Sequence, residues 1–467
     1  WEQRIIMAKK TKINIHINGK SYEAEPGETI IQVADRAGIH IPRFCYHPEL
    51  SVVANCRMCL VDVEKSPKTL AACNTQVSEG MRICTHSKAT QDSQKSVMEF
   101  LLINHPLDCP ICDQGGECEL QDLAMGYGKG KSRFYEKKRA VVDEDLGPLI
   151  QTHMTRCIHC TRCIRFGEEI AGMPEIGAVE RSNEMRISTY LQKGLKSEIS
   201  GNIIDICPVG ALTSKPFRFN GRSWEFKQTV GIAPHDSVGS NLFIHSYEQQ
   251  QDQCKVMRVI PKKDDNIGLW LSNRDRFSYE AVNAPERLGQ PAKKINGQWH
   301  DCTWPEMLRD LSQYLQDNKA QAQEWAALAS SSSTTEEFYL LQMVMRALGC
   351  QNLDHRMHKQ DFRGDAILPP SGPLNIESWS HLDKFKSILL LGSFPRHEQP
   401  MLNTYLRQAS LQGTSIASIN CLDQAFNFDL SHKIHCAPPE MLQQFSAIVK
   451  TLLKNKKIHP ELDKIQA

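Results

Sequence analysis

One histidine and three cysteines of this chain fall within a single short stretch, residues 105–118. Their spacing is H-x3-C-x2-C-x5-C, and Gly115 and Gly116 lie between the last two cysteines. Ligands this close together can surround one metal centre, and the two glycines let the backbone turn tightly around it. Taken alone, the stretch fits a zinc site with three cysteines and one histidine as well as it fits an iron–sulfur cluster.

Two sets of four cysteines flank this stretch and favour a series of iron–sulfur clusters over a lone zinc site. The three predicted ligand sets are Cys45, Cys56, Cys59 and Cys73; His105, Cys109, Cys112 and Cys118; and Cys157, Cys160, Cys163 and Cys207. The run C-x2-C-x2-C that begins at Cys157 is typical of a [4Fe–4S] site, and Cys207, followed by Pro208, is expected to complete it. The first set suits a [2Fe–2S] cluster, because an irregular loop leaves backbone N–H groups free to point at sulfur.

The histidines near these sets differ in their expected roles. His105 is predicted to be a ligand, and an imidazole in place of a thiolate removes a negative charge and should raise the reduction potential. His153 and His159 are interpreted as neighbouring or surface residues and not as ligands. Arg57, between two ligands, either adds positive charge to the first site or is an exposed loop arginine.

The remaining cysteines, the charge and the hydropathy limit the function classes. The chain has 467 residues, 17 cysteines and a net charge of +1, so no bulk field favours nucleic acid or anionic lipid. No apolar run approaches the length of a membrane span, so any membrane contact is expected through partners. The first residues lack an apolar signal core, so no secretory or organellar signal is expected there, and Met7 is a candidate natural start. Six isolated cysteines are expected to be buried apolar thiols: Cys84, Cys254, Cys302, Cys350, Cys421 and Cys436.

Local patterns in the first half predict a β-grasp domain and a helix. Residues 12–18 alternate apolar and polar side chains, Asn18-Gly19 is a type I′ turn signal, and 21–25 is the return strand. A helix is expected after Thr29, with Gly38 at its end. A second helix, 89–104, should end at His105, and the basic stretch 129–139 is predicted to be a solvated loop.

The second half alternates expected helices and strands, which predicts a doubly wound α/β domain. The helices are 304–323, 336–348 and 400–412, and the strands are 326–330, a buried strand at 386–391, and 415–419. His235 and Asp236 are interpreted as turn residues. The chain has no GxGxxG after a strand and no flavin motif, so no catalytic residue is assigned.

Residues 10–225 resemble the large iron–sulfur subunit of respiratory complex I, the NADH:quinone oxidoreductase. The resemblance rests on RFCYHP at 43–48, ANCRMCLV at 54–61, NHPLDCPICDQGGEC at 104–118, RCIHCTRCIRF at 156–166 and GNIIDICPVGALT at 201–213. It implies that the twelve residues of the three sets bind one [2Fe–2S] and two [4Fe–4S] clusters. Some members carry a further C-x2-C-x3-C set, but this chain has no cysteine from 230 until Cys254, so that cluster is expected to be absent.

The resemblance also implies an α/β and α+β multidomain fold. The expected domains are a β-grasp [2Fe–2S] ferredoxin domain at 10–88, a [4Fe–4S] domain with one histidine and three cysteine ligands at 89–128, a ferredoxin-like [4Fe–4S] domain at 129–225, and a shortened molybdopterin-oxidoreductase-like domain at 226–467, without cofactor. The implied function is electron relay from an FMN-bearing partner toward quinone, at the cytoplasmic side of a bacterial inner membrane or the mitochondrial matrix side. The implied partners are the flavoprotein and quinone-module subunits. Alternatives are an NAD-linked hydrogenase subunit, a formate dehydrogenase and a zinc-stabilised scaffold.

Overall fold

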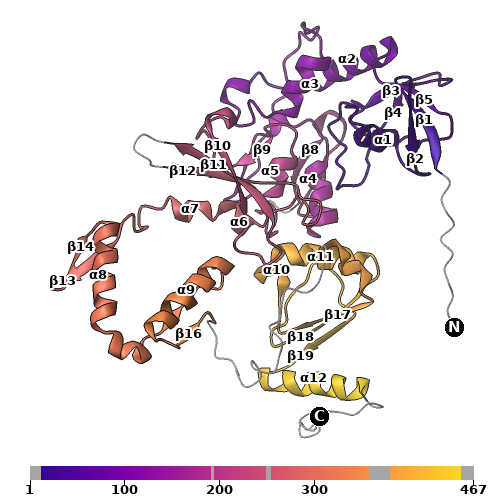
Figure 1. Cartoon of the computed structure of the whole chain (residues 1–467). Coiled ribbons are helices and arrows are strands. Elements are labelled where there is room, and N and C mark those ends of the chain that lie inside the picture. The colour runs from indigo at the N-terminus through magenta and orange to yellow at the C-terminus, as the bar shows by residue number, and fades with distance from the viewer. Residues whose placement is uncertain (1–11, 191–193, 249–253, 357–378, 454–467) are drawn as a thin grey trace.

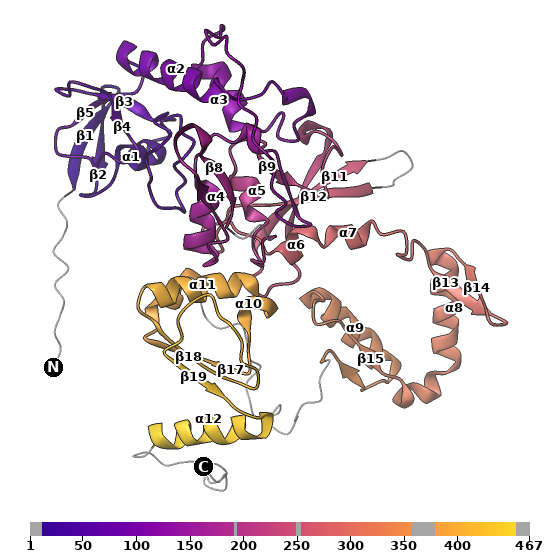
Figure 2. The same cartoon turned by 180° about the vertical axis from the view of Figure 1, so that it is seen from behind.

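The computed structural model describes residues 12–190, 194–248, 254–356 and 379–453, so the candidate start at Met7 lies outside the described residues (Figure 1). The chain forms an N-terminal sheet with its helix, a central region of short strands and helices, an antiparallel sheet, and two groups of α/β elements (Figures 1 and 2). No helix in these ranges is long and apolar enough to cross a bilayer.

The N-terminal part is the predicted β-grasp unit, with its own core. Asn18 and Gly19 both have positive φ, 52° and 81°, as a type I′ turn requires. The sheet has the order β2-β1-β5-β3-β4, with β1 parallel to β5 in the middle. Its elements are β1 (Ile13–Ile17), β2 (Lys20–Ala24), α1 (Ile30–Arg36), β3 (Leu60–Val63), β4 (Leu70–Ala71) and β5 (Arg82–Cys84).

Two helices follow and carry the His105 stretch between them. Helix α2 (Lys88–Leu102) begins at Ser87, whose side chain accepts a hydrogen bond from Thr90 N, and α3 (Glu119–Tyr127) begins directly after Cys118. The predicted basic loop 129–139 is largely exposed but anchored, because Lys138 Nζ donates to two carbonyls at the end of α2, Leu102 and Ile103, at 3.0 and 2.8 Å.

The central region consists of two short strand pairs around the third cysteine set. Strand β6 (Ile150–Thr152) pairs with β9 (Leu212–Ser214), and β7 (Ile176–Val179) pairs with β8 (Arg186–Thr189). The helices here are α4 (Arg162–Arg165), which continues into a π-helical turn, and α5 (Asn202–Ile206). Their apolar side chains share one core with the C-terminal helix α11 (Pro400–Leu411).

A three-stranded antiparallel sheet that local patterns did not predict joins the two halves. It consists of β10 (Lys227–Ile232), β11 (Asn241–Glu248) and β12 (Cys254–Pro261), followed by α6 (Asn273–Phe277) and α7 (Tyr279–Val282). The predicted turn at His235 and Asp236 is confirmed as the connection from β10 to β11. The buried Asp236 carboxylate also accepts a hydrogen bond from Met401 N of α11, at 2.7 Å.

The C-terminal elements confirm the α/β alternation. One group contains a hairpin and a parallel strand pair, and the other a parallel sheet in the order β17-β18-β19. The first group is β13 (Ala292–Ile295), β14 (Gln298–Asp301), α8 (Trp304–Asp317), β15 (Ala327–Leu328), α9 (Thr335–Leu348) and β16 (Leu353–Asp354). The second is β17 (Ser387–Leu391), α10 (Pro395–Glu398), α11, β18 (Ser415–Asn420), β19 (His432–His435) and α12 (Pro438–Leu452).

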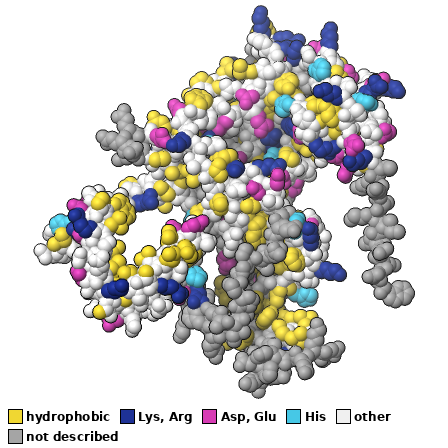
Figure 3. All heavy atoms as spheres, in the orientation of Figure 1, with side chains coloured by type: hydrophobic (Ala, Val, Ile, Leu, Met, Phe, Trp, Pro, Cys, Tyr) yellow, Lys and Arg dark blue, Asp and Glu magenta, His cyan; other side chains and the backbone are white. Residues whose placement is uncertain are grey.

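Two burial predictions were wrong. The strand at 386–391 is not fully buried, because Leu389 and Leu391 are 40% and 43% exposed, and apolar side chains are also exposed along α8 and α9 (Figure 3). Of the six isolated cysteines, only Cys302 and Cys350 are buried. Cys254 is exposed at the start of β12, and the remaining three are partly exposed.

Candidate iron–sulfur sites

The first cysteine set gathers where loops enter and leave the β-grasp sheet. Cys59 directly precedes β3, Cys73 follows β4, and Cys45 and Cys56 lie in the loop between α1 and β3. The Cys45 thiol lies within hydrogen-bond distance of both Cys56 and Cys73, and the Cys73 thiol also lies within hydrogen-bond distance of Cys59. The backbone N–H of Cys45 points at the Cys56 sulfur, at 3.4 Å. The structure therefore links the four thiols through neighbouring pairs.

The electrostatics of this set require a positive centre if all four thiols are to ionise. The hydrogen bond from Cys56 lowers the pKa of Cys45 to about 2. Hydrogen bonds to Cys45 and Cys59 raise the pKa of Cys73 instead, and the hydrogen bond from Cys73 lowers the pKa of Cys59, so without a metal the ionised thiols are held by protonated neighbours. Metal binding replaces those protons.

The second set lies between α2 and α3. The Cys109 and Cys112 thiolates are close enough to Cys118 to raise its pKa, although burial is the larger cause. His105 is partly buried, and its buried Nδ1 atom has no hydrogen-bond partner among the described residues. Burial, followed by the charges of Arg156 and Lys138, lowers the pKa of His105 to about 4, so the ring is neutral and can coordinate a metal.

Gly210, from the turn after Cys207, closely approaches the second set. A Cβ atom at this position would lie 2.1 Å from the Cys112 sulfur. The Cys118 sulfur lies 3.7 Å from the carbonyl oxygen of Pro208 in the same turn. The turn that carries the last cysteine of the third set therefore also forms a wall of the second.

The third set lines one small, enclosed and apolar cavity. Its four cysteines share this cavity with the apolar side chains of Met154, Ile158, Ile187, Val209, Ala211 and Leu212. Burial raises the pKa of Cys157, Cys160 and Cys207 to about 12. Three buried cysteines and one partly buried cysteine around an apolar cavity match the donor set of a [4Fe–4S] cluster. Within the described ranges, no three His, Cys, Asp or Glu side chains are grouped to hold a single metal ion, so the fit rests on this cavity and on the contacts above.

The three sets are neighbours in space. A groove of about 650 Å³ is lined by one residue of each set, Cys56, His105 and Cys157. The histidines predicted to be non-ligands have other contacts. The His153 ring hydrogen-bonds Arg218 at 3.2 Å, and the His159 ring hydrogen-bonds the Met185 backbone.

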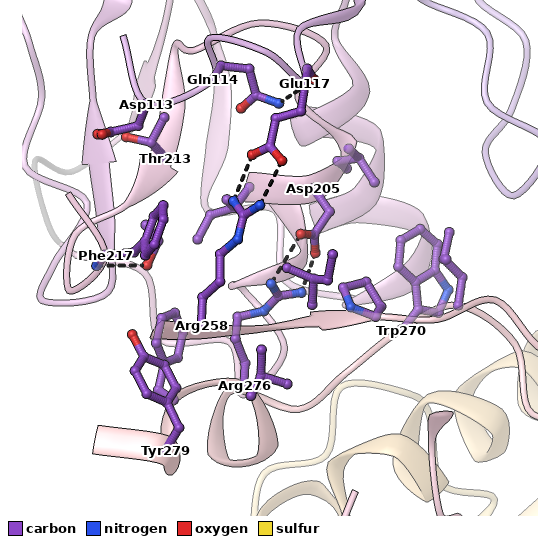
Figure 4. Close-up of a pocket in the computed structure, with 18 of the residues that line it drawn as sticks. Asp113, Gln114, Glu117, Asp205, Thr213, Phe217, Arg258, Trp270, Arg276 and Tyr279 are labelled. Atoms are coloured by element: carbon purple, nitrogen blue, oxygen red, sulfur yellow. Dashed lines mark hydrogen bonds and ion pairs between the residues drawn. The ribbon is translucent and has the colours of Figure 1, made fainter. Parts of the chain in front are cut away.

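A second cavity, of about 320 Å³, is lined by residues next to the second and third sets and by strand β12 (Figure 4). Two carboxylates from the cysteine-bearing segments point into it, and each pairs with an arginine of the second half. Arg258 donates to both oxygens of Glu117, and Arg276 pairs with Asp205. No sequence motif predicts these pairs, because partners so far apart in the chain share no spacing signal.

Family models match most of the chain in the same order as these features. Residues 10–88 match a 2Fe-2S iron-sulfur cluster binding domain, 94–133 the NADH-ubiquinone oxidoreductase-G iron-sulfur binding region, and 147–213 the ferredoxin-like domain of NADH-quinone oxidoreductase subunit 3. Residues 287–459 match molybdopterin oxidoreductase. The chain is thus a multidomain iron–sulfur protein with an α/β oxidoreductase-type C-terminal part, and the predicted fold class and kinds of cluster domain are confirmed.

Curated relatives identify the particular family. The chain is 44% identical over 393 residues to an NADH-quinone oxidoreductase subunit of Rickettsia conorii, covering 84% of this chain and 57% of the relative. It is 41% identical over 419 residues to the NADH-ubiquinone oxidoreductase 75 kDa subunit of Reclinomonas americana, covering 86% and 59%. The chain belongs to this family, the large iron–sulfur (75 kDa) subunit of NADH:quinone oxidoreductase, and spans less than two thirds of the length of these relatives.

One solved structure is a more distant match. A chain of an NAD+-reducing [NiFe]-hydrogenase is 25% identical, with a TM-score of 0.40, and the match covers 45% of this chain and 90% of that chain. A TM-score this low does not define a common fold for the two chains. The curated relatives, independently of this match, favour the complex I family over the hydrogenase alternative.

Proposed function

We propose that this chain is an electron-transfer subunit of NADH:quinone oxidoreductase. The observation that carries the proposal is the third set, whose four thiols surround a single enclosed, apolar cavity. When bound, iron–sulfur clusters supply reversible one-electron storage. The polypeptide contributes ligands, separation and the exclusion of water, and no side chain of it forms or breaks a substrate bond.

The proposed ligands are the twelve residues of the three sets. Cys45, Cys56, Cys59 and Cys73 hold a [2Fe–2S] cluster. The other two sets each hold a [4Fe–4S] cluster: His105, Cys109, Cys112 and Cys118, and Cys157, Cys160, Cys163 and Cys207. In the third set, the Sγ atoms of Cys157, Cys160 and Cys207 keep their protons until iron takes their place, because burial raises the pKa of each thiol to about 12.

The domain assignment follows these sets. The chain begins with a [2Fe–2S] domain at 10–88, followed by a [4Fe–4S] domain with the His105 set at 89–128. A ferredoxin-like [4Fe–4S] domain at 129–225 comes next, and the α/β part occupies 226–467. The α/β part serves as a structural platform without a cofactor. Its contacts with the central region support this role: Arg396 Nε lies 3.0 Å from Glu198 Oε1, and Arg407 donates to the carbonyl of Glu168 at 2.8 Å.

The proposed partners are other subunits of the complex. An FMN-bearing, NADH-oxidising flavoprotein subunit supplies single electrons, and quinone-module subunits receive them. Proton translocation is a property of the whole complex. The chain is peripheral, at the cytoplasmic side of a bacterial inner membrane or at the matrix side in mitochondria, and it contacts the membrane through partners and binds no nucleic acid.

Metal analysis of anaerobically isolated protein tests this proposal. We expect about ten iron atoms per chain, with matching acid-labile sulfide and paramagnetic signals on reduction. Cys207→Ser should lose about four of these iron atoms, whereas Cys436→Ser, a substitution of a cysteine outside the sets, should lose none. Zinc in place of iron, or a colourless folded protein from oxygen-free cells, would contradict the proposal.

A further inference from the structure

Three buried arginines lie on the segment that carries the third cysteine set. Arg156, Arg162 and Arg165 are 4%, 4% and 6% exposed. A buried guanidinium is unfavourable unless its N–H groups and its charge are satisfied. The partners of these arginines therefore reveal why cations are kept in this core.

Arg162 contacts the neighbour of a predicted ligand in every set. Its nitrogens donate to Glu119, which follows Cys118, at 2.8 and 3.1 Å. They also donate to the carbonyl of Ile206, which precedes Cys207, and to the carbonyl of Tyr46, which follows Cys45, each at 3.1 Å. Arg162 itself lies between Cys160 and Cys163. One side chain therefore contacts the segments of all three sets, through two backbone carbonyls and one carboxylate.

The remaining donor of this guanidinium is unpaired among the described residues. Arg162 Nε is buried and forms no hydrogen bond within that part of the chain. The Cys160 and Cys207 thiolates are close enough to raise the pKa of Arg162, although burial opposes this and Glu119 contributes more. Because Arg162 lies between Cys160 and Cys163 in the chain, its unpaired N–H is available to donate to sulfur, and hydrogen bonds to sulfur are one determinant of a cluster's potential.

Arg165, in the same helix, has a different set of partners. Its guanidinium donates to the carbonyls of Cys45 and Ser51, each at 2.5 Å, and more weakly to the carbonyl of Cys160 and to the Thr161 hydroxyl. Within the described ranges it pairs with no carboxylate, and none of its nitrogens is an unpaired buried donor. The ion pair with Glu119 and the free Nε–H therefore distinguish Arg162.

We propose that Arg162 is a positioning residue for electron transfer, which holds the three ligand-bearing segments at fixed separations and raises the reduction potential of the [4Fe–4S] cluster at the third set. This inference rests on the proposed function. The physical reason is that reduction adds negative charge, and a buried cation nearby stabilises that charge. The Glu119 carboxylate, paired with the same guanidinium, lowers the reduction potential of that cluster.

Two substitutions that should shift the reduction potential in opposite directions distinguish this role from a structural one. Arg162→Gln removes the cation, so at a fixed applied potential the ratio of reduced to oxidised third cluster should fall at least tenfold, about 59 mV for a one-electron couple. Glu119→Gln removes the partner carboxylate and should raise that ratio. Merely structural damage would not shift the potential in opposite directions in the two variants.

The measurement is a paramagnetic-resonance redox titration of the anaerobically isolated full chain. Arg162→Lys keeps the charge and should keep the potential near that of the wild type, while losing the paired contacts and altering the magnetic coupling between neighbouring reduced clusters. Arg287→Gln, at an exposed arginine after α7, is the control and should change nothing. In wild-type protein labelled with ¹⁵N-arginine, we expect a nitrogen hyperfine coupling to the third cluster.

The outcomes distinguish the two proposals. Wild-type protein without iron would overturn the proposed function itself. Full iron content in Arg162→Gln with an unshifted potential would overturn only the role of Arg162. If Arg162→Gln loses its clusters, the Glu119→Gln variant and the labelled wild type decide. An unchanged reduction potential of the third cluster in Glu119→Gln, together with no arginine hyperfine coupling in the wild type, would overturn the role of Arg162 as well.

Discussion

Glu117 and Arg258, 141 positions apart, form a two-point ion pair in which each carboxylate oxygen lies 2.7 Å from a guanidinium nitrogen. Glu117 precedes Cys118 of the second set, and Arg258 lies on β12 with its guanidinium over the Phe217 ring. The pair therefore connects a proposed ligand segment to the β10–β12 sheet (Figure 4).

Removing one partner of this pair should destabilise the protein more than removing both. Arg258→Met leaves the Glu117 carboxylate partly buried without its cation, and we expect a loss of about 2 kcal/mol. Glu117→Gln combined with Arg258→Met should recover part of that loss, because no unpaired charge remains. Thermal unfolding of the two single variants and the double variant measures the coupling. Strictly additive effects would contradict an energetic pair.

Acid should destabilise the β10–β12 sheet through His245. Burial, and then the charge of Arg258, lowers the pKa of this histidine from its ordinary value of 6.5. The neutral ring accepts a hydrogen bond from Arg258 Nε at 3.1 Å. Because the folded-state pKa is the lower one, the stability from His245 is complete above pH 6.5 and is lost as the pH falls through the folded-state value.

The measurement for His245 is the difference in apparent melting temperature between wild type and His245→Gln as a function of pH. We expect this difference to shrink as the pH falls from 7.5 to about 5, because only the wild type carries the titrating ring. A constant difference across this range would contradict the prediction. Comparing the two proteins at each pH removes the effect of acid on the rest of the chain.

Local chemistry explains why the first half was predictable. The alternation around Ile15 and the Asn18-Gly19 turn are set by near neighbours, and they appear as β1 and β2 with the expected turn. The His105 stretch similarly carries its ligand types and spacing within a few turns of chain. Such features depend little on distant residues, so the sequence alone reveals them.

Contacts between residues far apart in the chain explain which features could not be predicted from the sequence. The β10–β12 sheet has no strong alternation, and the partners of Arg162 lie 43, 44 and 116 positions away. An apolar run such as 386–391 indicates a strand but not what covers it, and Leu389 and Leu391 are partly exposed. Burial depends on tertiary contacts that a local pattern does not contain.

Gly210→Ala should prevent formation of the second cluster while leaving the fold intact. The added methyl group would lie 2.1 Å from the Cys112 sulfur, so the Cys112 segment must move away. We expect a loss of about four iron atoms and of one set of paramagnetic signals. Gly126→Ala in α3 is the matched control, because a Cβ there meets nothing within 4 Å. This control should retain all iron and be slightly more stable, since alanine favours the helix. Full iron content in Gly210→Ala would contradict the close approach.

His105→Cys should keep a cluster at the second set but lower its reduction potential. A thiolate in place of the neutral imidazole adds one negative charge, which disfavours the more negative reduced state. The charges of Arg156 and Lys138, which act on His105, should limit the size of the shift without changing its sign. A redox titration of the variant against wild type, with iron content measured on both, tests this. His153→Cys is the matched control, because that ring hydrogen-bonds Arg218 and is not among the proposed ligands. An unchanged or higher potential in His105→Cys, with iron retained, would show that His105 does not bind the cluster.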